Sequence, residues 1–137
     1  MYNLAQDYIS STDYLIMIDL TEAEFGVYHG FLDNWGLVWK AQCAVGAPET
    51  PTPVDATEVY EKYLWFDSGD VRLWYATPFN GSNYIHSVTY YPDDGPYEIE
   101  DPTVGAAISH GCIRLELKRA KWVYDNIPIG TLVVTYE

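Results

Sequence analysis

The chain has 137 residues, and its 20 Asp and Glu residues against 7 Lys and Arg residues give a formal net charge of −13. This length favours one domain with a sizeable core, and a hydrophobic fraction of 48% excludes a disordered or low-complexity chain. The acidic balance argues against nucleic acid and anionic membrane surfaces as partners, because both require clustered Lys and Arg. The sequence also lacks an apolar run of the ~18–20 residues that a membrane-spanning helix needs.

The N-terminal segment differs in composition from the rest of the chain. Residues 1–12 are polar and are expected to be a tail or the remnant of a linker. This segment lacks the basic and apolar regions of a signal peptide. Residues 13–137 contain no linker-like stretch, so they are expected to form a single domain.

Strand-length runs of β-prone residues recur along most of the chain. Strands are predicted over residues 14–20, 25–30, 37–45, 59–66, 71–76, 84–91 and 131–136. Turns are predicted at His29-Gly30 and at residues 33–34, 67–70 and 80–83. In the third run, Cys43 alternates with apolar residues from Leu37 to Val45, so it is expected to be a small buried hydrophobe.

Two irregular segments and one helix complete this prediction. Residues 46–53 contain three prolines and predict a stiff loop, and the acidic, Pro- and Gly-rich residues 92–106 predict a long one. From Leu117 the apolar residues follow a helical spacing, which predicts a helix over about residues 116–127. The expected fold is mainly β, a sandwich or partly open barrel of mixed sheets with one significant C-terminal helix.

The sharpest local feature is a cysteine just before the predicted helix, in the run Ser109-His110-Gly111-Cys112-Ile113-Arg114. A helix N-terminus and a neighbouring imidazolium both favour a thiolate, so the pKa of Cys112 is expected to fall to ~3.5–7.5. Gly111 permits a turn in which its own N–H and that of Cys112 point at a developing oxyanion. Arg114 is expected to hold a substrate carboxylate or to brace the loop. The alternative interpretation is a buried cysteine beside a surface histidine.

This motif and other segments resemble the L,D-transpeptidases, the YkuD-like domains that cross-link bacterial peptidoglycan. The resemblance rests on the Ser-His-Gly-Cys-Ile-Arg-Leu run and its following helix, on Gly46 with the Thr50-Pro51-Thr52-Pro53 loop, and on the Tyr84-Ile85-His86-Ser87 strand. It covers residues 13–137 and implies a catalytic domain over this range. It also implies the YkuD-like form of the mainly β fold, with a long active-site loop.

The resemblance implies roles for eight residues. Cys112 corresponds to the nucleophile and His86 to the base that withdraws its proton, so residues 84–91 must run beside residues 109–114. The 26 residues between His86 and Cys112 exceed the commonest family spacing, which implies a longer lid over residues 92–106. The other implied positions are His110, Gly111, Ser109 and Ser87 in the site loop and oxyanion hole, with His110 the alternative base, and Arg114 and Tyr84 in substrate binding.

The implied reaction is acyl transfer through a Cys112 thioester. A peptidoglycan stem tetrapeptide is the donor, D-alanine leaves, and an amine accepts the acyl group to give a 3-3 cross-link. The alternatives are an L,D-carboxypeptidase, which uses water as acceptor, and a non-catalytic cell-wall-binding module. The resemblance implies no cofactor, carbapenems as covalent inhibitors, and an extracytoplasmic location in the cell wall or periplasm. A zinc site at His86, His110 and Cys112 is chemically possible but lacks a closely spaced ligand pair.

Overall fold

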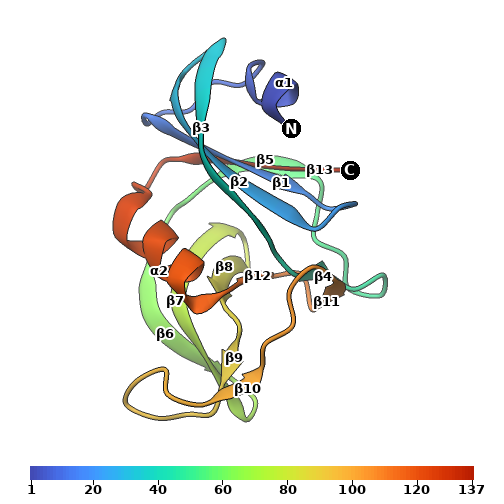
Figure 1. Cartoon of the computed structure of the whole chain (residues 1–137), viewed down its shortest axis with the longest axis vertical. Helices are drawn as coiled ribbons and strands as arrows, with labels where there is room; N and C mark the ends of the chain where they lie inside the picture. The colour runs from blue at the N-terminus through green and yellow to red at the C-terminus, as the bar shows by residue number, and fades with distance from the viewer.

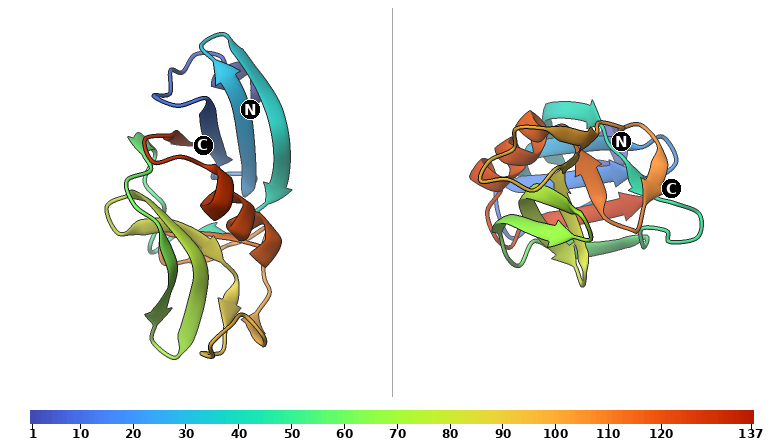
Figure 2. Two further views of the ribbon diagram at one scale, coloured as in Figure 1. Left: turned by 90° about the vertical axis from the view of Figure 1, so that its left-hand side faces the viewer. Right: turned by 90° about the horizontal axis from the view of Figure 1, so that it is seen from below.

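Two mixed β-sheets lie one above the other, with the longer of two helices between them at one side (Figure 1). The computed structural model describes all residues, 1–137. The helices are α1 (Tyr2–Ala5) and α2 (Leu117–Asn126). Figure 2 shows α2 at the junction of the two sheets. The mainly β fold with one significant C-terminal helix is therefore confirmed.

The first sheet brings the two ends of the chain together. Its strands are β1 (Tyr14–Asp19), β2 (Glu24–Phe31), β3 (Asn34–Gln42), β5 (Asp55–Glu58) and β13 (Leu132–Tyr136). They are arranged in the order β3-β2-β1-β13-β5. The central strand β1 pairs in parallel with β13, and the other neighbours pair antiparallel.

The second sheet carries the predicted histidine strand. Its strands are β6 (Tyr63–Ser68), β7 (Val71–Asn80), β8 (Asn83–Ser87), β9 (Thr89–Tyr90), β10 (Ile99–Asp101) and β12 (Ile113–Leu115). The order is β10-β9-β7-β8-β12, with β6 also paired to β7. Two short parallel strands, β4 (Val45–Gly46) and β11 (Ala107–Ser109), form a separate pair.

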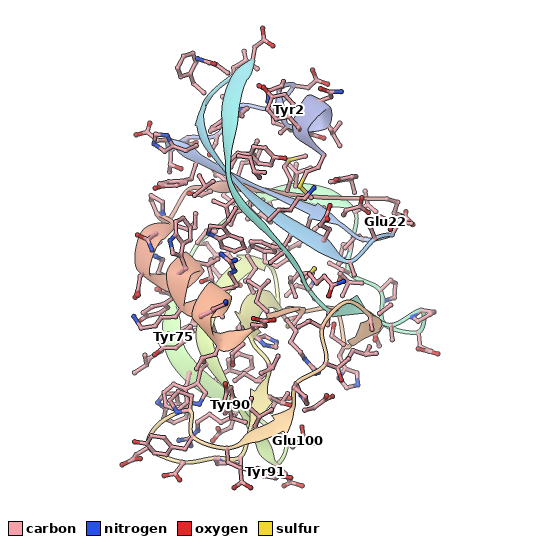
Figure 3. The ribbon with its side chains drawn as sticks, viewed as in Figure 1. Tyr2, Glu22, Tyr75, Tyr90, Tyr91 and Glu100 are labelled. Atoms are coloured by element: carbon pink, nitrogen blue, oxygen red, sulfur yellow. The ribbon has the colours of Figure 1, made fainter.

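The long loop after β9 lies at the end of the second sheet that is farthest from the first sheet. Figure 3 labels Tyr90, Tyr91 and Glu100 in this region. Within the loop, β10 pairs antiparallel with β9, and the Tyr91 N–H donates to the Glu98 carbonyl. The loop is thus fixed to the sheet by backbone hydrogen bonds rather than being entirely irregular.

The main core lies between the two sheets and α2. Ile16 and Ile18 of β1 enter this core, and Ala120 and Val123 of α2 pack in the same cluster.

A second cluster lies on the opposite face of the first sheet. Because side chains alternate along a strand, Leu15 and Met17 of β1 face this side. There they pack beneath the N-terminal segment, so four successive residues of β1 are buried.

Residues 1–12 pack against the outer face of the first sheet. Ala5 of α1 is fully buried. The side-chain amide of Gln6 donates to the Trp35 carbonyl at 3.0 Å, and its oxygen accepts the Trp35 N–H at 2.8 Å. These contacts cover the Leu15 and Met17 side of β1.

Three local expectations were wrong. His29 and Gly30 lie within β2 instead of forming a turn, because Gly30 pairs with Trp35 and the chain reverses after Phe31. Residues 59–62 are not a strand, whereas the polar residues 55–58 form the edge strand β5. Leu37 is exposed, because a register shift in the β2–β3 pairing interrupts the alternation that placed it with Cys43.

Neither helix has the length and apolar character that would let it span a bilayer.

Candidate active site

The loop from Ser109 to Cys112 joins β11 to β12 and is closed by one side chain. Ser109 Oγ accepts the Gly111 N–H at 3.1 Å and donates to the Cys112 carbonyl at 2.6 Å. Gly111 has a φ of +118°, and a Cβ there would lie 2.5 Å from Asn83 Oδ1. The sequence therefore needs glycine at this position to form the turn.

The pairing of β8 with β12 brings the cysteine loop to the histidine strand. The two strands are parallel, and Ile113 faces Ile85 while Arg114 faces His86. Cys112 consequently lies beside Tyr84, whose backbone N–H donates to Cys112 Sγ at 3.3 Å. The sulfur also lies 3.7 Å from the Ser82 carbonyl oxygen. This adjacency meets the requirement that residues 84–91 run beside residues 109–114.

His86 is held in one tautomer. Its side chain is buried, and Nδ1 lies 2.7 Å from the Ser87 carbonyl oxygen. Because a carbonyl only accepts, Nδ1 carries the proton and Nε2 keeps its lone pair. The Phe66 ring packs edge-on at 5.8 Å. Burial lowers the pKa of His86 to about 4; the bond to Ser87 opposes this and the Arg114 charge adds to it.

Cys112 and His86 both line one cavity of about 250 Å³. Its apolar lining includes Phe66, Leu73 and Ile108, and its polar lining includes His110 and Arg114 beside His86 and Cys112. The cavity therefore combines a thiol, a neutral imidazole and a guanidinium group. Ligand pockets commonly have this composition, with apolar walls and a few convergent polar groups.

Arg114 connects the cavity to the long loop. Its Nη1 lies 3.1 Å from Asp101 Oδ2, and only 11% of the side chain is exposed. Its Nε is buried without a hydrogen-bond partner. The other oxygen of Asp101 accepts the N–H and hydroxyl of Thr103. The guanidinium group is thus held from one side and retains donor capacity.

The family model for the YkuD L,D-transpeptidase catalytic domain matches residues 13–135. The chain belongs to this family. The Bacillus subtilis protein YciB, whose name assigns it to the L,D-transpeptidases, is 43% identical over 78 residues, which cover 54% of this chain and 40% of YciB. A Mycobacterium tuberculosis protein named as L,D-transpeptidase 3 is 32% identical over 106 residues, 69% of this chain and 37% of that protein. The chain thus matches about two fifths of the length of these relatives.

Solved structures show the same YkuD fold. A fused zinc-dependent amidase/peptidase and peptidoglycan-binding-domain protein from Clostridium acetobutylicum has a TM-score of 0.81 and 36% identity, covering 98% of this chain and 57% of that chain. L,D-transpeptidase 3 from Mycobacterium tuberculosis, solved with a faropenem-derived adduct, has a TM-score of 0.70 and 24% identity, covering 91% and 60% of the two chains. The family model and the named relatives confirm the family resemblance noted in the sequence.

The surroundings of the thiol correct one expectation. Cys112 does not lie at a helix N-terminus, because Ile113–Leu115 form β12 and α2 begins only at Leu117. Burial raises the pKa of Cys112, and the hydrogen bond from the Tyr84 N–H opposes this only in part. The expected low pKa of Cys112 is therefore wrong for this YkuD domain.

The remaining predicted residues contribute in different ways. His110 is exposed at the cavity. The Ser87 hydroxyl accepts the Trp74 N–H and donates to the Val88 carbonyl. Ser87 therefore contacts the site through its backbone carbonyl, which binds His86 Nδ1, and not through its hydroxyl. Tyr84 meets the sulfur through its backbone, and its ring packs against Phe66.

Only one of the two backbone N–H groups expected to bind the oxyanion is free to do so. The Gly111 N–H is occupied by Ser109 Oγ, whereas the Cys112 N–H has no partner. Nor do His86, His110 and Cys112 form a metal site, since no three His, Cys, Asp or Glu side chains converge closely enough to hold an ion.

Sequence reasoning missed Asp101 and Phe66. Asp101 lay in an acidic loop with no periodicity, and Phe66 lay in a run interpreted only as strand. The signal that could have found Phe66 is strand alternation, which places it and Leu73 opposite each other in the β6–β7 pairing.

Proposed function

We propose that this chain is a peptidoglycan L,D-transpeptidase domain that transfers an acyl group through a Cys112 thioester. The observation that carries the proposal is that Cys112 and a neutral His86, with its Nε2 unprotonated, line the same cavity. A binding module needs neither a nucleophile nor a base, so this pair favours an enzyme over a non-catalytic cell-wall-binding module.

In the first half-reaction, Cys112 Sγ attacks the carbonyl carbon of the third residue of a stem tetrapeptide while its proton passes to His86 Nε2. The Cys112 side chain has to turn toward His86 for this transfer, because the resting sulfur contacts the Tyr84 N–H and the Ser82 carbonyl. The Cys112 N–H stabilises the developing oxyanion. When the tetrahedral intermediate collapses, the C–N bond breaks and D-alanine leaves with the proton from His86.

In the second half-reaction, an amine attacks the thioester carbonyl and His86 Nε2 accepts its proton. The C–S bond then breaks, the thiolate recovers the proton, and a 3-3 cross-link remains. Water in place of the amine would give the L,D-carboxypeptidase reaction. Arg114 lines the cavity, and its guanidinium group is suited to hold a carboxylate of the stem peptide there.

Peptidoglycan as the substrate implies that the domain acts outside the cytoplasmic membrane, in the cell wall or periplasm. The imipenem complex of the L,D-transpeptidase LdtMt1 and the faropenem-derived adduct of the Mycobacterium tuberculosis relative support carbapenems and related β-lactams as covalent inhibitors of this chain as well. Such compounds would acylate Cys112 by the chemistry of the first half-reaction.

Mass spectrometry of the protein incubated with a disaccharide-tetrapeptide tests the proposal. We expect a transient adduct on Cys112 and a cross-linked dimer, and neither with Cys112→Ala. Formation of tripeptide alone would assign the carboxypeptidase reaction. Binding of the muropeptide without an adduct or product would contradict the enzymatic proposal and favour the wall-binding module.

A further inference from the structure

The proline-rich segment between β4 and β5 places a buried hydroxyl group against the cysteine loop. Thr52 is 5% exposed, although its neighbours Pro51 and Pro53 are exposed. Its Oγ1 accepts the Gly46 N–H at 3.0 Å and donates to the Gly111 carbonyl oxygen at 2.7 Å. One side chain thus connects the start of the proline segment to the residue before Cys112.

The carbonyl group that Thr52 binds belongs to the peptide unit between Gly111 and Cys112. A trans peptide is planar, and its C=O and N–H point in opposite directions. A hydrogen bond that fixes the Gly111 carbonyl therefore also fixes the direction of the Cys112 N–H. This N–H is free, whereas the preceding N–H of Gly111 is already bound to Ser109 Oγ.

Other contacts of the same segment hold the beginning of the cysteine loop. Thr50 Oγ1 donates to the Ser109 carbonyl oxygen at 3.0 Å, and the Ala47 N–H donates to the same oxygen at 2.8 Å. The two threonines thus bind carbonyl groups on either side of His110. With both ends held, the peptide unit before Cys112 has little freedom to rotate.

The backbone of the segment is folded closely to reach this position. A Cβ on Gly46 would lie 2.3 Å from the Thr50 carbonyl oxygen and 2.5 Å from the Thr52 nitrogen. Only glycine permits this approach, which brings the Gly46 N–H within reach of the Thr52 hydroxyl. Gly46 and Thr52 therefore form one structural unit with the Gly111 carbonyl.

We propose that Thr52 is a positioning residue that directs the Cys112 N–H toward the oxyanion formed when Cys112 attacks a carbonyl carbon. The inference rests on the proposed acyl transfer and adds to it a residue outside the cavity. An oxyanion donor is effective only when it is aimed in advance at the developing charge. The Thr52 hydroxyl provides this direction and also polarises the peptide unit, which strengthens its N–H as a donor.

The test compares two reactions of Cys112 that differ in whether an oxyanion forms. Acylation by a carbapenem passes through a tetrahedral oxyanion, whereas alkylation by iodoacetamide displaces iodide and forms none. Thr52→Val removes the hydroxyl at similar volume, and Thr52→Ser retains it. Thr77→Val is the matched control, because the Thr77 hydroxyl is buried but has no hydrogen-bond partner.

We expect Thr52→Val to slow carbapenem acylation by about 10- to 100-fold, the effect of a displaced catalytic group, while the alkylation rate changes little. Thr52→Ser should restore most of the acylation rate, and Thr77→Val should match the wild type in both reactions. Stopped-flow fluorescence and intact-protein mass spectrometry measure the two rates.

Equal slowing of acylation and alkylation by Thr52→Val would show a general disturbance of the loop and overturn the inference. An acylation rate of Thr52→Val equal to that of the wild type would also overturn it, while leaving the proposed function intact. If wild-type Cys112 is alkylated but never acylated, the proposed function fails, and the role of Thr52 fails with it.

Discussion

The backbone N–H of Tyr84 donates a 3.3 Å hydrogen bond to Cys112 Sγ. This bond favours a thiolate, but burial of the sulfur outweighs it and raises the pKa of Cys112. The pKa of His86 is lowered by its own burial. Both groups are therefore neutral near pH 7, and the proton moves only when the sulfur attacks a substrate.

The first prediction concerns the titration of this thiol. In a Cys43→Ala background, the rate of Cys112 alkylation by iodoacetamide should keep rising with pH and show its inflection above ~8.5, the usual value for cysteine. The reason is the burial of the sulfur. Mass spectrometry across a pH series measures the rate. A plateau already reached at pH 7 would mean that a thiolate–imidazolium pair exists at rest.

The second prediction separates the two cysteines. Cys112→Ala should abolish covalent labelling by a carbapenem, and Cys43→Ala should leave labelling intact. Cys43 is fully buried in the main core, and burial raises its pKa to about 12. Its loss should cost only about 1 kcal/mol of unfolding free energy, because a small apolar group is removed from the core. Labelling that disappears with Cys43 would contradict the assignment of Cys112.

The third prediction concerns stability in acid. The pKa of His86 is about 4 in the folded protein against an ordinary value of 6.5, so the unfolded chain binds the proton more tightly. The stability due to neutral His86 is complete above pH 6.5 and is lost as the pH falls toward 4, by about 3 kcal/mol in total. Urea unfolding of wild type and His86→Gln between pH 4 and 7 measures the difference in slope.

An identical slope for the wild type and His86→Gln would mean that His86 is already accessible to protons in the folded state.

The fourth prediction concerns Gly46. Gly46→Ala should lower the unfolding free energy by about 1–3 kcal/mol, since its Cβ would overlap the backbone of Thr50 and Thr52. Gly36→Ala is the matched control, because the nearest atom to its Cβ is 3.7 Å away. Chemical denaturation of both variants gives the comparison. Equal stabilities would show that the proline-rich segment shifts freely.

The fifth prediction concerns Arg114. Arg114→Lys keeps the positive charge but loses the fork of donors, so the KM for a tetrapeptide donor should rise by about tenfold. Arg119→Lys is the control, because Arg119 lies on α2 over the Trp39 ring and does not line the cavity. Steady-state kinetics with a disaccharide-tetrapeptide measures the KM of both variants. An unchanged KM would assign Arg114 to bracing Asp101 alone.

Much of the fold could be predicted from local patterns. The β-prone apolar run at residues 14–20 and the helical period from Leu117 correspond to β1 and α2, because both bury apolar side chains in the main core. The edge strand β5 could not be found in this way. Its residues are polar and mostly exposed, and it exists because β13 provides a partner for its backbone.

The candidate site was predictable in its residue types but not in its contacts. Cys112 and His86 stood out by motif, and the parallel β8–β12 pairing explains how they come to line one cavity. The contact between the Tyr84 N–H and the sulfur depends on the register of that pairing, which no local pattern encodes. The Arg114–Asp101 ion pair likewise depends on where a long acidic loop returns to the sheet.

The parallel pairing of β1 with β13 sets the order in which the molecule can fold. Leu15 of β1 pairs with Leu132 of β13, so formation of this central pair encloses almost the whole chain in one loop. Such closure carries a large loop entropy and makes folding slow compared with domains dominated by local contacts. Until β13 arrives, an apolar strand at the centre of the sheet lacks one partner and is open to association with other chains.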